Sequence, residues 1–371
     1  MRMFNKNFII LFLLLSACSN SKLNGNRADV LTAGSLDPFG RTAINQQQEL
    51  ELISSAAHVG FSFEGNEATI YANIPATNGH NYMQYEMDGV YKGRIRVEGK
   101  NSQPIVLKEE NEGMHIVWIY KATEAHTGPL FIEKIEAKNI KSLSRKNLPL
   151  IEFIGNSITC GAAADPSEVP CGSGEYHDQH NAYEAYGPKV ARALNTNFLL
   201  SSVSGAGIYR NWNSDGPALP LLYEQTDFQQ NSSRPWNFDL YSPDIVSIAL
   251  GTNDLSNGDG IKERLPFDSA RFINNYIQFV QLVKSKYPHA QIALLSSPMV
   301  NGERRNLLQH CLLAVKREID QLFPTHKPVA LYFFQPMQAR GCSGHPSVED
   351  HAVLASELIP FFEKLLKDGK K

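Results

Sequence analysis

The stretch PLIEFIGNSIT, residues 149–159, begins as a nearly continuous apolar run and ends in a glycine, an asparagine and a serine. Such a run is typical of a strand that is buried on both faces of a sheet. Similar runs recur downstream and alternate with amphipathic helical segments, which predicts an α/β domain over 149–371, with a parallel sheet covered by helices on both faces. The strand-like segments are 149–155, 197–204, 243–250, 290–296 and 328–334, and the helix-like segments are 182–195, 270–288, 303–323 and 347–368.

The segment 46–140 follows a different pattern. Apolar side chains recur at every second position in 59–63 and again in 68–72, and Asp88-Gly89 marks a hairpin turn between two strand-like runs. Many short strands separated by turn signals predict a β-sandwich, of the jelly-roll type. The polar segment 141–148 is expected to link this domain to the α/β domain.

The start of the chain is similar to an export signal. A positively charged start precedes the apolar run 8–15, which is too short to cross a bilayer as a helix. The sequence LSAC, residues 15–18, is similar to a bacterial lipoprotein processing site, in which Cys18 becomes the lipid-bearing first residue. We therefore expect a signal peptide over 1–17, a polar tether over 18–45, and an exported lipoprotein anchored to a membrane in the periplasm or at the cell surface. An ordinary cleaved signal peptide is the alternative.

Composition excludes some classes of partner. Of 371 residues, 42% are hydrophobic and 20% are charged, as in a globular protein. The 35 Lys and Arg residues are balanced by 38 Asp and Glu residues and form no long basic run, which argues against nucleic acid as a partner.

Four cysteines follow Cys18, and export to an oxidising compartment permits disulfides among them. Cys160 and Cys171 bracket a loop rich in Gly, Pro and Asp and are the favoured pair. Four cysteines allow three full pairings, and the sequence does not choose between them. The alternative is that most of Cys160, Cys171, Cys311 and Cys342 are free and buried.

Polar residues or glycine follow four of the expected strands. Ser157 lies at the mouth of a helix, where backbone N–H groups can receive an oxyanion. Gly205 offers an unobstructed N–H group, Asn253 offers an amide donor, and His345 follows the last strand. Each residue alone has an ordinary explanation as a cap or a turn. Because the carboxyl ends of parallel strands meet at one edge of a sheet, the four together predict a catalytic site.

These four blocks, GNSIT, Gly205, GTND and HP, resemble those of the SGNH (GDSL-type) hydrolase superfamily over 149–371. The segments FEGNEATIYA, YEMDGVYKG and HIVWIYKATEAHTG resemble the β-sandwich that precedes the catalytic domain in carbohydrate esterase family 2. The resemblance implies removal of acetyl groups from plant-type polysaccharides or oligosaccharides such as xylan and mannan, without a metal or another cofactor. It implies Ser157 as nucleophile, His345 as base, and an oxyanion hole of Ser157, Gly205 and Asn253.

No acidic residue directly precedes His345. Relatives often carry an acid two residues before this histidine, where the chain has Ser343, and an aromatic residue directly before it, where the chain has Gly344. The third member of a triad orients the histidine and selects its tautomer without taking the proton. A nearby backbone carbonyl or the Ser343 hydroxyl can do the same. We therefore expect a Ser–His dyad that forms an acetyl-enzyme, with part of the usual substrate wall missing at position 344.

Other polar and aromatic residues have weaker signals. Aromatic residues after the second strand are placed to stack on a sugar ring, although a buried structural role is equally consistent. A metal site in the loop 177–180 is disfavoured, and the remaining acidic residues and the second histidine of the last helix are expected to be structural. The stacking candidates are Tyr209, Trp212 and Trp236, the metal-like residues are His177, Asp178 and His180, and the structural ones are Asp215, Asp254 and His351.

Two other functions fit the sequence. One is an SGNH lipase or thioesterase that acts on longer acyl esters, which would need a long apolar groove. The other is a glycan-binding lipoprotein whose hydrolase domain has lost activity. Retention of Ser157, Gly205, Asn253 and His345 argues against the second. The sequence leaves open the sugar, the acetylated hydroxyl and the oligomeric state.

Overall fold

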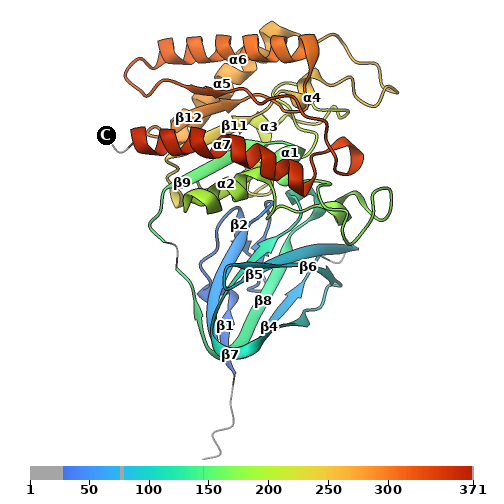
Figure 1. Ribbon diagram of the computed structural model, residues 1–371, viewed down its shortest axis with the longest axis vertical. Helices are drawn as coiled ribbons and strands as arrows, with labels where there is room; N and C mark the ends of the chain where they lie inside the picture. Colours follow the sequence, from blue (N-terminus) through green and yellow to red (C-terminus); the bar gives the residue numbers. More distant parts are fainter. Residues whose placement is uncertain (1–27, 76–78, 145, 370–371) are drawn as a thin grey trace, which may run out of the picture.

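The computed structural model describes residues 28–75, 79–144 and 146–369, which form two domains (Figure 1). An antiparallel β domain from the first part of the chain lies against one side of an α/β domain from the second part. Among these residues, no helix combines the length and the apolar character that crossing a bilayer requires. The expected signal peptide and Cys18 lie outside the described residues.

The β domain is an eight-stranded antiparallel sheet around one apolar core. It confirms the predicted β domain, and all eight strands are hydrogen-bonded into one continuous sheet that surrounds this core. The order along the sheet is β2-β3-β8-β4-β7-β5-β6, with β1 paired to β8. The strands are β1 (Asp29–Thr32), β2 (Thr42–Ile44), β3 (Leu50–Leu52), β4 (His58–Asn73), β5 (His80–Met87), β6 (Val90–Glu98), β7 (Gln103–Lys121) and β8 (Leu130–Ser142), with short 3-10 turns η1 (Ala33–Ser35) and η2 (Ala125–Thr127).

A bulge explains how the 16-residue β4 keeps one face buried. Before the bulge the buried apolar positions are odd, as at Phe61 and Phe63, and after it they are even, as at Ile70. The register of β4 against β7 shifts between Gly65 and Glu67. One extra residue would turn the side chains to the opposite face if the pairing stayed regular, and the bulge restores the inward direction.

Two expected boundaries were wrong. Residues of the predicted tether 18–45 form β1 and β2, whose backbones pair with β8 and β3. Within it Phe39 is buried. At the other end, β8 continues to Ser142, two residues into the predicted linker, and the first strand of the α/β domain begins at Leu150.

The α/β domain contains a five-stranded parallel sheet, as predicted. Its order is β10-β9-β11-β12-β13. Alternate residues of β12 contact opposite cores: Leu294 packs with α5 and α6, while Leu295 packs with α2 and α7. Helices therefore cover both faces (Figure 1). The strands are β9 (Leu150–Gly155), β10 (Asn197–Ser202), β11 (Ile245–Ala249), β12 (Gln291–Leu295) and β13 (Ala330–Tyr332). The helices are α1 (Ser157–Cys160), α2 (Tyr186–Leu194), α3 (Leu219–Leu222), α4 (Thr252–Leu255), α5 (Ser269–Lys286), α6 (Gly302–Leu322) and α7 (Val348–Asp368), with 3-10 turns η3 (Tyr176–Gln179), η4 (Phe238–Leu240) and η5 (Cys342–Gly344).

The strand order places a crevice at the end of β9. The connection after β9 leads to β10 on one side, and the connection after β10 leads back to β11 on the other side. In open parallel sheets, ligands bind at the carboxyl ends of the strands where the order reverses in this way. Ser157 begins α1 directly after β9, so the topology places it at this point.

A buried arginine joins the two domains. Arg41, between β1 and β3, is 1% exposed and lies inside the α/β domain. Its guanidinium donates to the Gln225 carbonyl at 2.6 Å and stacks over the ring of Phe228 at 4.2 Å. Its charge faces the buried carboxylate of Glu152, which accepts hydrogen bonds from Ser201 and from a tyrosine hydroxyl. A buried charge is tolerated only when opposite charge and hydrogen bonds surround it.

Replacing Arg41 with methionine tests this joint. Arg41→Met keeps much of the side-chain volume but leaves Glu152 without its buried cation, so the free energy of unfolding should fall by roughly 2–4 kcal/mol. Chemical denaturation measures the change. Arg317→Met, on the exposed face of α6, is the matched control and should change stability by less than about 0.5 kcal/mol. Equal effects of the two substitutions would contradict a special role for Arg41.

Candidate active site

Ser157 is the first residue of α1 and lies in a sharp strand-to-helix turn. The side chain of Asn156 caps this turn by accepting the N–H of Ile158 at 3.1 Å. Gly155 has no room for a side chain, because a Cβ there would overlap Thr159. The turn therefore needs a small residue before the cap, and it places the serine hydroxyl at the carboxyl edge of the sheet.

Gly205 and Asn253 lie in the loops after the two strands beside β9. Gly205 has a φ of +75°, and no atom lies within 4 Å of the place where a Cβ would be, so its backbone is open to a ligand. Asn253, in α4, uses one amide hydrogen to donate to the Ala206 carbonyl at 2.8 Å and keeps a second for another acceptor. The structure thus brings the expected oxyanion donors to the same edge as Ser157.

The buried carboxylate of Asp254 shapes the loop that follows Gly205. It accepts the backbone N–H groups of Ile208, Tyr209 and Arg210 at 3.0–3.3 Å. Burial raises the pKa of Asp254, against the effect of these hydrogen bonds. Asp254 therefore has the structural role expected from the sequence, although it holds another loop rather than capping its own helix.

His345 is held by a backbone carbonyl. Its Nδ1 lies 3.1 Å from the carbonyl oxygen of Ser343, which as an acceptor selects the tautomer with a proton on Nδ1. The Nε2 lone pair is then available for proton transfer. Ser343, at φ +51°, and Gly344, at φ +70°, are both in the left-handed region, and this turn aims the carbonyl at the ring. Burial lowers the pKa of His345, more than the Ser343 carbonyl raises it.

A disulfide fixes the loop that carries His345, and it differs from the favoured pairing. Cys342 is bonded to Cys171, whereas Cys160 and Cys311 are free and buried. Cys160 follows Ser157 within α1 and points into the core, where its thiol donates to Ser202 at 3.2 Å. It therefore faces away from the loop that carries Cys171. The sequence spacing favoured a local pair, but the fold brings together residues 171 positions apart.

Glu124 of the β domain reaches this edge of the sheet. The sequence did not predict it as a site residue. Its carboxylate accepts the N–H of Ser204, next to Gly205, at 2.8 Å, and lies 3.4 Å from Nε2 of the buried His180. Burial would raise the pKa of Glu124, but hydrogen bonds with His180 and Ser204 outweigh it and lower the pKa to about 2. The carboxylate is therefore charged. A lone glutamate outside the α/β domain gave no signal of this position.

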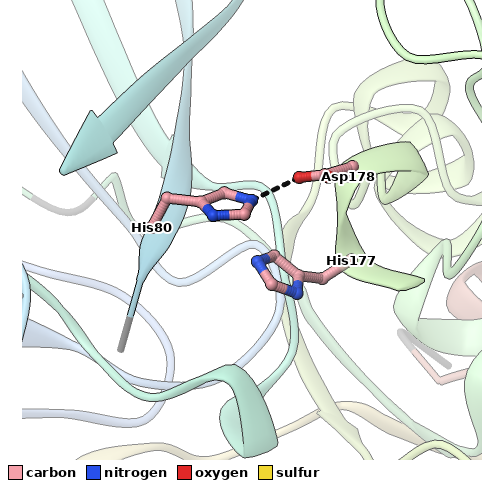
Figure 2. A group of neighbouring side chains, drawn as sticks. All are labelled: His80, His177 and Asp178. Atoms are coloured by element: carbon pink, nitrogen blue, oxygen red, sulfur yellow. Dashed lines mark hydrogen bonds and ion pairs between the residues drawn. The ribbon is translucent and has the colours of Figure 1, made fainter. Parts of the chain in front are cut away.

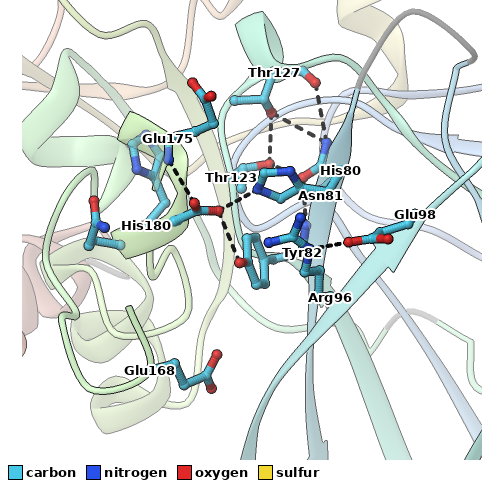
Figure 3. Close-up of polar contacts among 12 residues, drawn as sticks. His80, Asn81, Tyr82, Arg96, Glu98, Thr123, Thr127, Glu168, Glu175 and His180 are labelled. Atoms are coloured by element: carbon cyan, nitrogen blue, oxygen red, sulfur yellow. Dashed lines mark hydrogen bonds and ion pairs between the residues drawn. The ribbon is translucent and has the colours of Figure 1, made fainter. Parts of the chain in front are cut away.

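The loop of Glu124 is held by a network from the β domain. Asn81, Thr123 and Thr127 are joined by side-chain hydrogen bonds (Figure 3). The ammonium group of Lys121 donates to the backbone carbonyls of Thr123 and Glu124 at 3.1 and 2.6 Å. These bonds fix the strand end from which Glu124 projects.

A cleft of about 590 Å³ opens beside Gly205. Trp212 lines it and is 45% exposed, as a stacking residue would be. Tyr209 packs against Phe267, and its hydroxyl accepts the N–H of Asp268. The stacking role suggested for Trp236 was wrong, and the buried structural alternative holds: Trp236 is 7% exposed and packs in a cluster at the opposite end of β9. Of the three candidate aromatic residues, Trp212 is the one that lines the cleft.

The structure joins His177 and Asp178 with His80 rather than with His180. Potential ligand atoms of these three residues lie within 4.8 Å of one another (Figure 2). However, Asp178 already pairs with His80 (Figure 2), accepts the Tyr82 hydroxyl at 3.0 Å and accepts the N–H of Glu175. With its carboxylate oxygens occupied in this way, Asp178 acts as a polar clamp between the domains.

Two further predictions concern structural residues. His351, in α7, is buried and accepts the N–H of Tyr186 at 3.3 Å, and burial lowers its pKa to about 3. Asp215 is exposed and pairs with Lys262. Neither residue lines the cleft beside Gly205.

Comparison with known proteins identifies the family. Residues 39–145 match the model described as carbohydrate esterase 2 N-terminal, and residues 153–331 match the GDSL-like lipase/acylhydrolase family. The chain belongs to carbohydrate esterase family 2. It is 26% identical over 363 residues, 95% of each chain, to a protein of Cellvibrio japonicus named acetylxylan esterase / glucomannan deacetylase. It is therefore a serine ester hydrolase of the carbohydrate esterase type.

Solved structures of family 2 esterases share both domains. One from Cellvibrio japonicus matches with a TM-score of 0.79 and 25% identity, over 93% of this chain and 99% of that one. Another, from Clostridium thermocellum in complex with cellohexaose, matches with a TM-score of 0.78 and 25% identity, over 91% and 99% of the chains. The arrangement of the two domains is thus that of the family.

Removing the disulfide should destabilise this esterase. In the double variant Cys171→Ser/Cys342→Ser, the free energy of unfolding should fall by about 2–4 kcal/mol, because the cross-link no longer restricts the unfolded chain. Denaturation with and without a thiol reductant measures the effect. Wild type should lose stability on reduction, and the double variant should not respond. A reductant response that persists in the double variant would contradict the pairing.

Proposed function

We propose that this esterase removes O-acetyl groups from plant-type polysaccharides or oligosaccharides, such as xylan and glucomannan. The name of the Cellvibrio japonicus relative supports the acetyl group and the glycan class, and the cellohexaose complex of the Clostridium thermocellum enzyme supports a β-linked sugar chain. The cleft beside Gly205 combines aromatic side chains, such as Trp212 and Phe228, with polar ones, such as Gln229, and a sugar ring needs both kinds of contact.

The observation that carries the mechanism is the contact between His345 Nδ1 and the Ser343 carbonyl. A carbonyl selects the same imidazole tautomer as the aspartate of a triad, but it does not supply the negative charge that stabilises imidazolium. We therefore infer that Ser157 and His345 work as a dyad. Glu124, whose negative charge acts on His345 from the β domain, supplies part of the missing stabilisation at longer range.

The reaction follows from these positions. Ser157 Oγ attacks the acetyl carbonyl carbon while His345 Nε2 takes its proton. The oxyanion accepts hydrogen bonds from the backbone N–H groups of Ser157 and Gly205 and from the Asn253 amide. The bond to the sugar oxygen then breaks, and His345 returns the proton to that oxygen. Water, activated by His345, attacks the acetyl-enzyme and releases acetate.

We also propose that the protein is exported and anchored through a lipid on Cys18. The first 18 residues support this by their pattern alone. The Cys171–Cys342 disulfide adds independent support, because disulfides persist in oxidising compartments such as the periplasm or the cell surface.

Acetate release tests the function. Wild-type protein should release acetate from acetylated xylan or acetylated glucomannan, and Ser157→Ala should lower the rate by at least about 10³-fold because the nucleophile is lost. Enzymatic determination of acetate measures both, and Ser343→Ala, which keeps the backbone carbonyl, is a control that should retain activity. Hydrolysis of long acyl esters alone would favour a lipase-like function. No hydrolysis of any ester would favour a glycan-binding protein.

The pH profile tests the state of His345. The base must be neutral in the free enzyme, and burial lowers the pKa of His345 from 6.5. Activity should therefore be lost as protonation of the ring removes the base, and kcat/KM should stay level through pH 7 and fall below pH 6.5. Steady-state rates on a soluble acetyl ester between pH 4 and pH 9 measure the midpoint. A midpoint clearly above 6.5 would indicate a carboxylate at Nδ1 and would contradict support by a carbonyl.

A further inference from the structure

Tyr176 is an exposed aromatic residue beside the proposed base. Its hydroxyl lies 3.4 Å from Nε2 of His345, and the two ring centroids are 6.0 Å apart at an interplanar angle of 60°. Because Nδ1 of His345 donates to Ser343, Nε2 is the acceptor and the tyrosine hydroxyl is the donor. Nε2 is also the atom that returns a proton to the leaving oxygen. The Tyr176 hydroxyl therefore lies beside the position that a leaving sugar oxygen must take.

Three constraints hold Tyr176 in this position. The disulfide from Cys171 ties its loop to Cys342, in the turn that carries His345. On the other side, Asp178 pairs with His80 of β5, and Arg94 of β6 donates to the carbonyl of Asp178 at 2.7 Å. The pair of His80 and Asp178 is visible in Figure 2. The loop between the two attachments presents Tyr176 from a fixed base.

The ring of Tyr176 also packs on a buried side chain. The ring of Tyr176 packs edge-to-face on His180, with centroids 4.8 Å apart at an interplanar angle of 87°. His180 is fully buried, and its Nδ1 accepts the N–H of Ala163 at 3.2 Å. Tyr176 nevertheless remains 42% exposed. A ring that is fixed at its base and open to solvent is suited to receive a flat apolar surface.

The wall of the site is open next to this ring. Gly344 has a φ of +70°, and no atom lies within 4 Å of the place where its Cβ would be. No side chain therefore competes with Tyr176 for contact with a ligand directly before His345. Trp212, the exposed aromatic residue of the cleft, lies instead with Gly205 on the oxyanion side.

We propose that Tyr176 determines specificity for the sugar that carries the acetyl group: its ring packs on the apolar face of that sugar, and its hydroxyl donates a hydrogen bond to the leaving oxygen. This assignment rests on the proposed O-acetylesterase function. Tyr176 transfers no proton. His345 donates the proton that the sugar oxygen gains as the ester bond breaks. A tyrosine hydroxyl keeps its hydrogen at neutral pH and therefore remains a donor.

Two esters distinguish contact of Tyr176 with the sugar from an effect of Tyr176 on the hydrolysis of any ester. An acetylated xylo-oligosaccharide has the sugar leaving group, whereas 4-nitrophenyl acetate has no sugar and a leaving group that needs little protonation. Tyr176→Ala should lower kcat/KM on the oligosaccharide by about 10–100-fold, with less than about threefold change on the aryl ester. Tyr176→Phe, which keeps the ring, should lose about 3–10-fold on the oligosaccharide. Tyr71→Ala, on β4 of the β domain, is the matched control and should leave kcat/KM unchanged on both esters.

The outcomes distinguish this assignment from the proposed function. Suppose that wild type deacetylates the oligosaccharide and that Tyr176→Ala lowers kcat/KM equally on both esters. Tyr176 then positions His345 and does not contact the sugar, which overturns the assignment. Unchanged rates in Tyr176→Ala overturn it as well. If wild type hydrolyses the aryl ester but no acetylated carbohydrate, the proposed function itself fails and the assignment fails with it. Thermal unfolding of Tyr176→Phe verifies that the loop is intact in the variant that keeps the ring.

Discussion

The charge of Arg41, buried inside the neighbouring domain, is the constraint on which the arrangement of the two domains depends. A guanidinium removed from water is stable only with acceptors and opposite charge around it. Here the α/β domain supplies them through the Gln225 carbonyl, the face of Phe228 and the carboxylate of Glu152. A shift of one domain against the other would leave Arg41 without its acceptors and Glu152 without its buried cation. The interface therefore has one favourable geometry, and side chains of the β domain can serve the site with fixed positions.

That fixed interface makes the β domain part of the active site. Glu124 crosses from the end of β7 to bind the N–H next to Gly205, so the loop that offers an oxyanion donor is held by a carboxylate from the other domain. His80 and Arg94 hold the loop that presents Tyr176 in the same way. One contact holds the loop of Gly205, and the other holds the loop beside His345. In this chain the β domain therefore holds two loops of the candidate site in the α/β domain.

Local patterns predicted what depends on local physics. The apolar run before Ser157 predicted a buried strand, and the alternation of strands and helices predicted the parallel sheet that gathers Ser157, Gly205, Asn253 and His345 at one edge. Contacts between distant segments gave no such signal. The disulfide joins residues far apart in the chain, and the pairing of β1 with β8 depends on a partner more than 100 residues away. Trp236 was misjudged for the same reason, because its burial is decided by Phe39 and Tyr241.

Support of His345 by a carbonyl changes what the protein must keep rigid. A carboxylate side chain can rotate to meet an imidazole, whereas a backbone carbonyl points where its peptide plane is fixed. The orientation of the Ser343 carbonyl therefore depends on the whole turn 341–345, which includes two consecutive left-handed residues. Hydrogen bonds from the N–H of Gly341 to His345 and from the N–H of Cys342 to Ala163 close this turn, and the disulfide at Cys342 fixes it to a second loop. With no acidic side chain at this turn, the orientation of the His345 ring depends on a cross-linked stretch of backbone, and the same cross-link holds Tyr176 beside that ring.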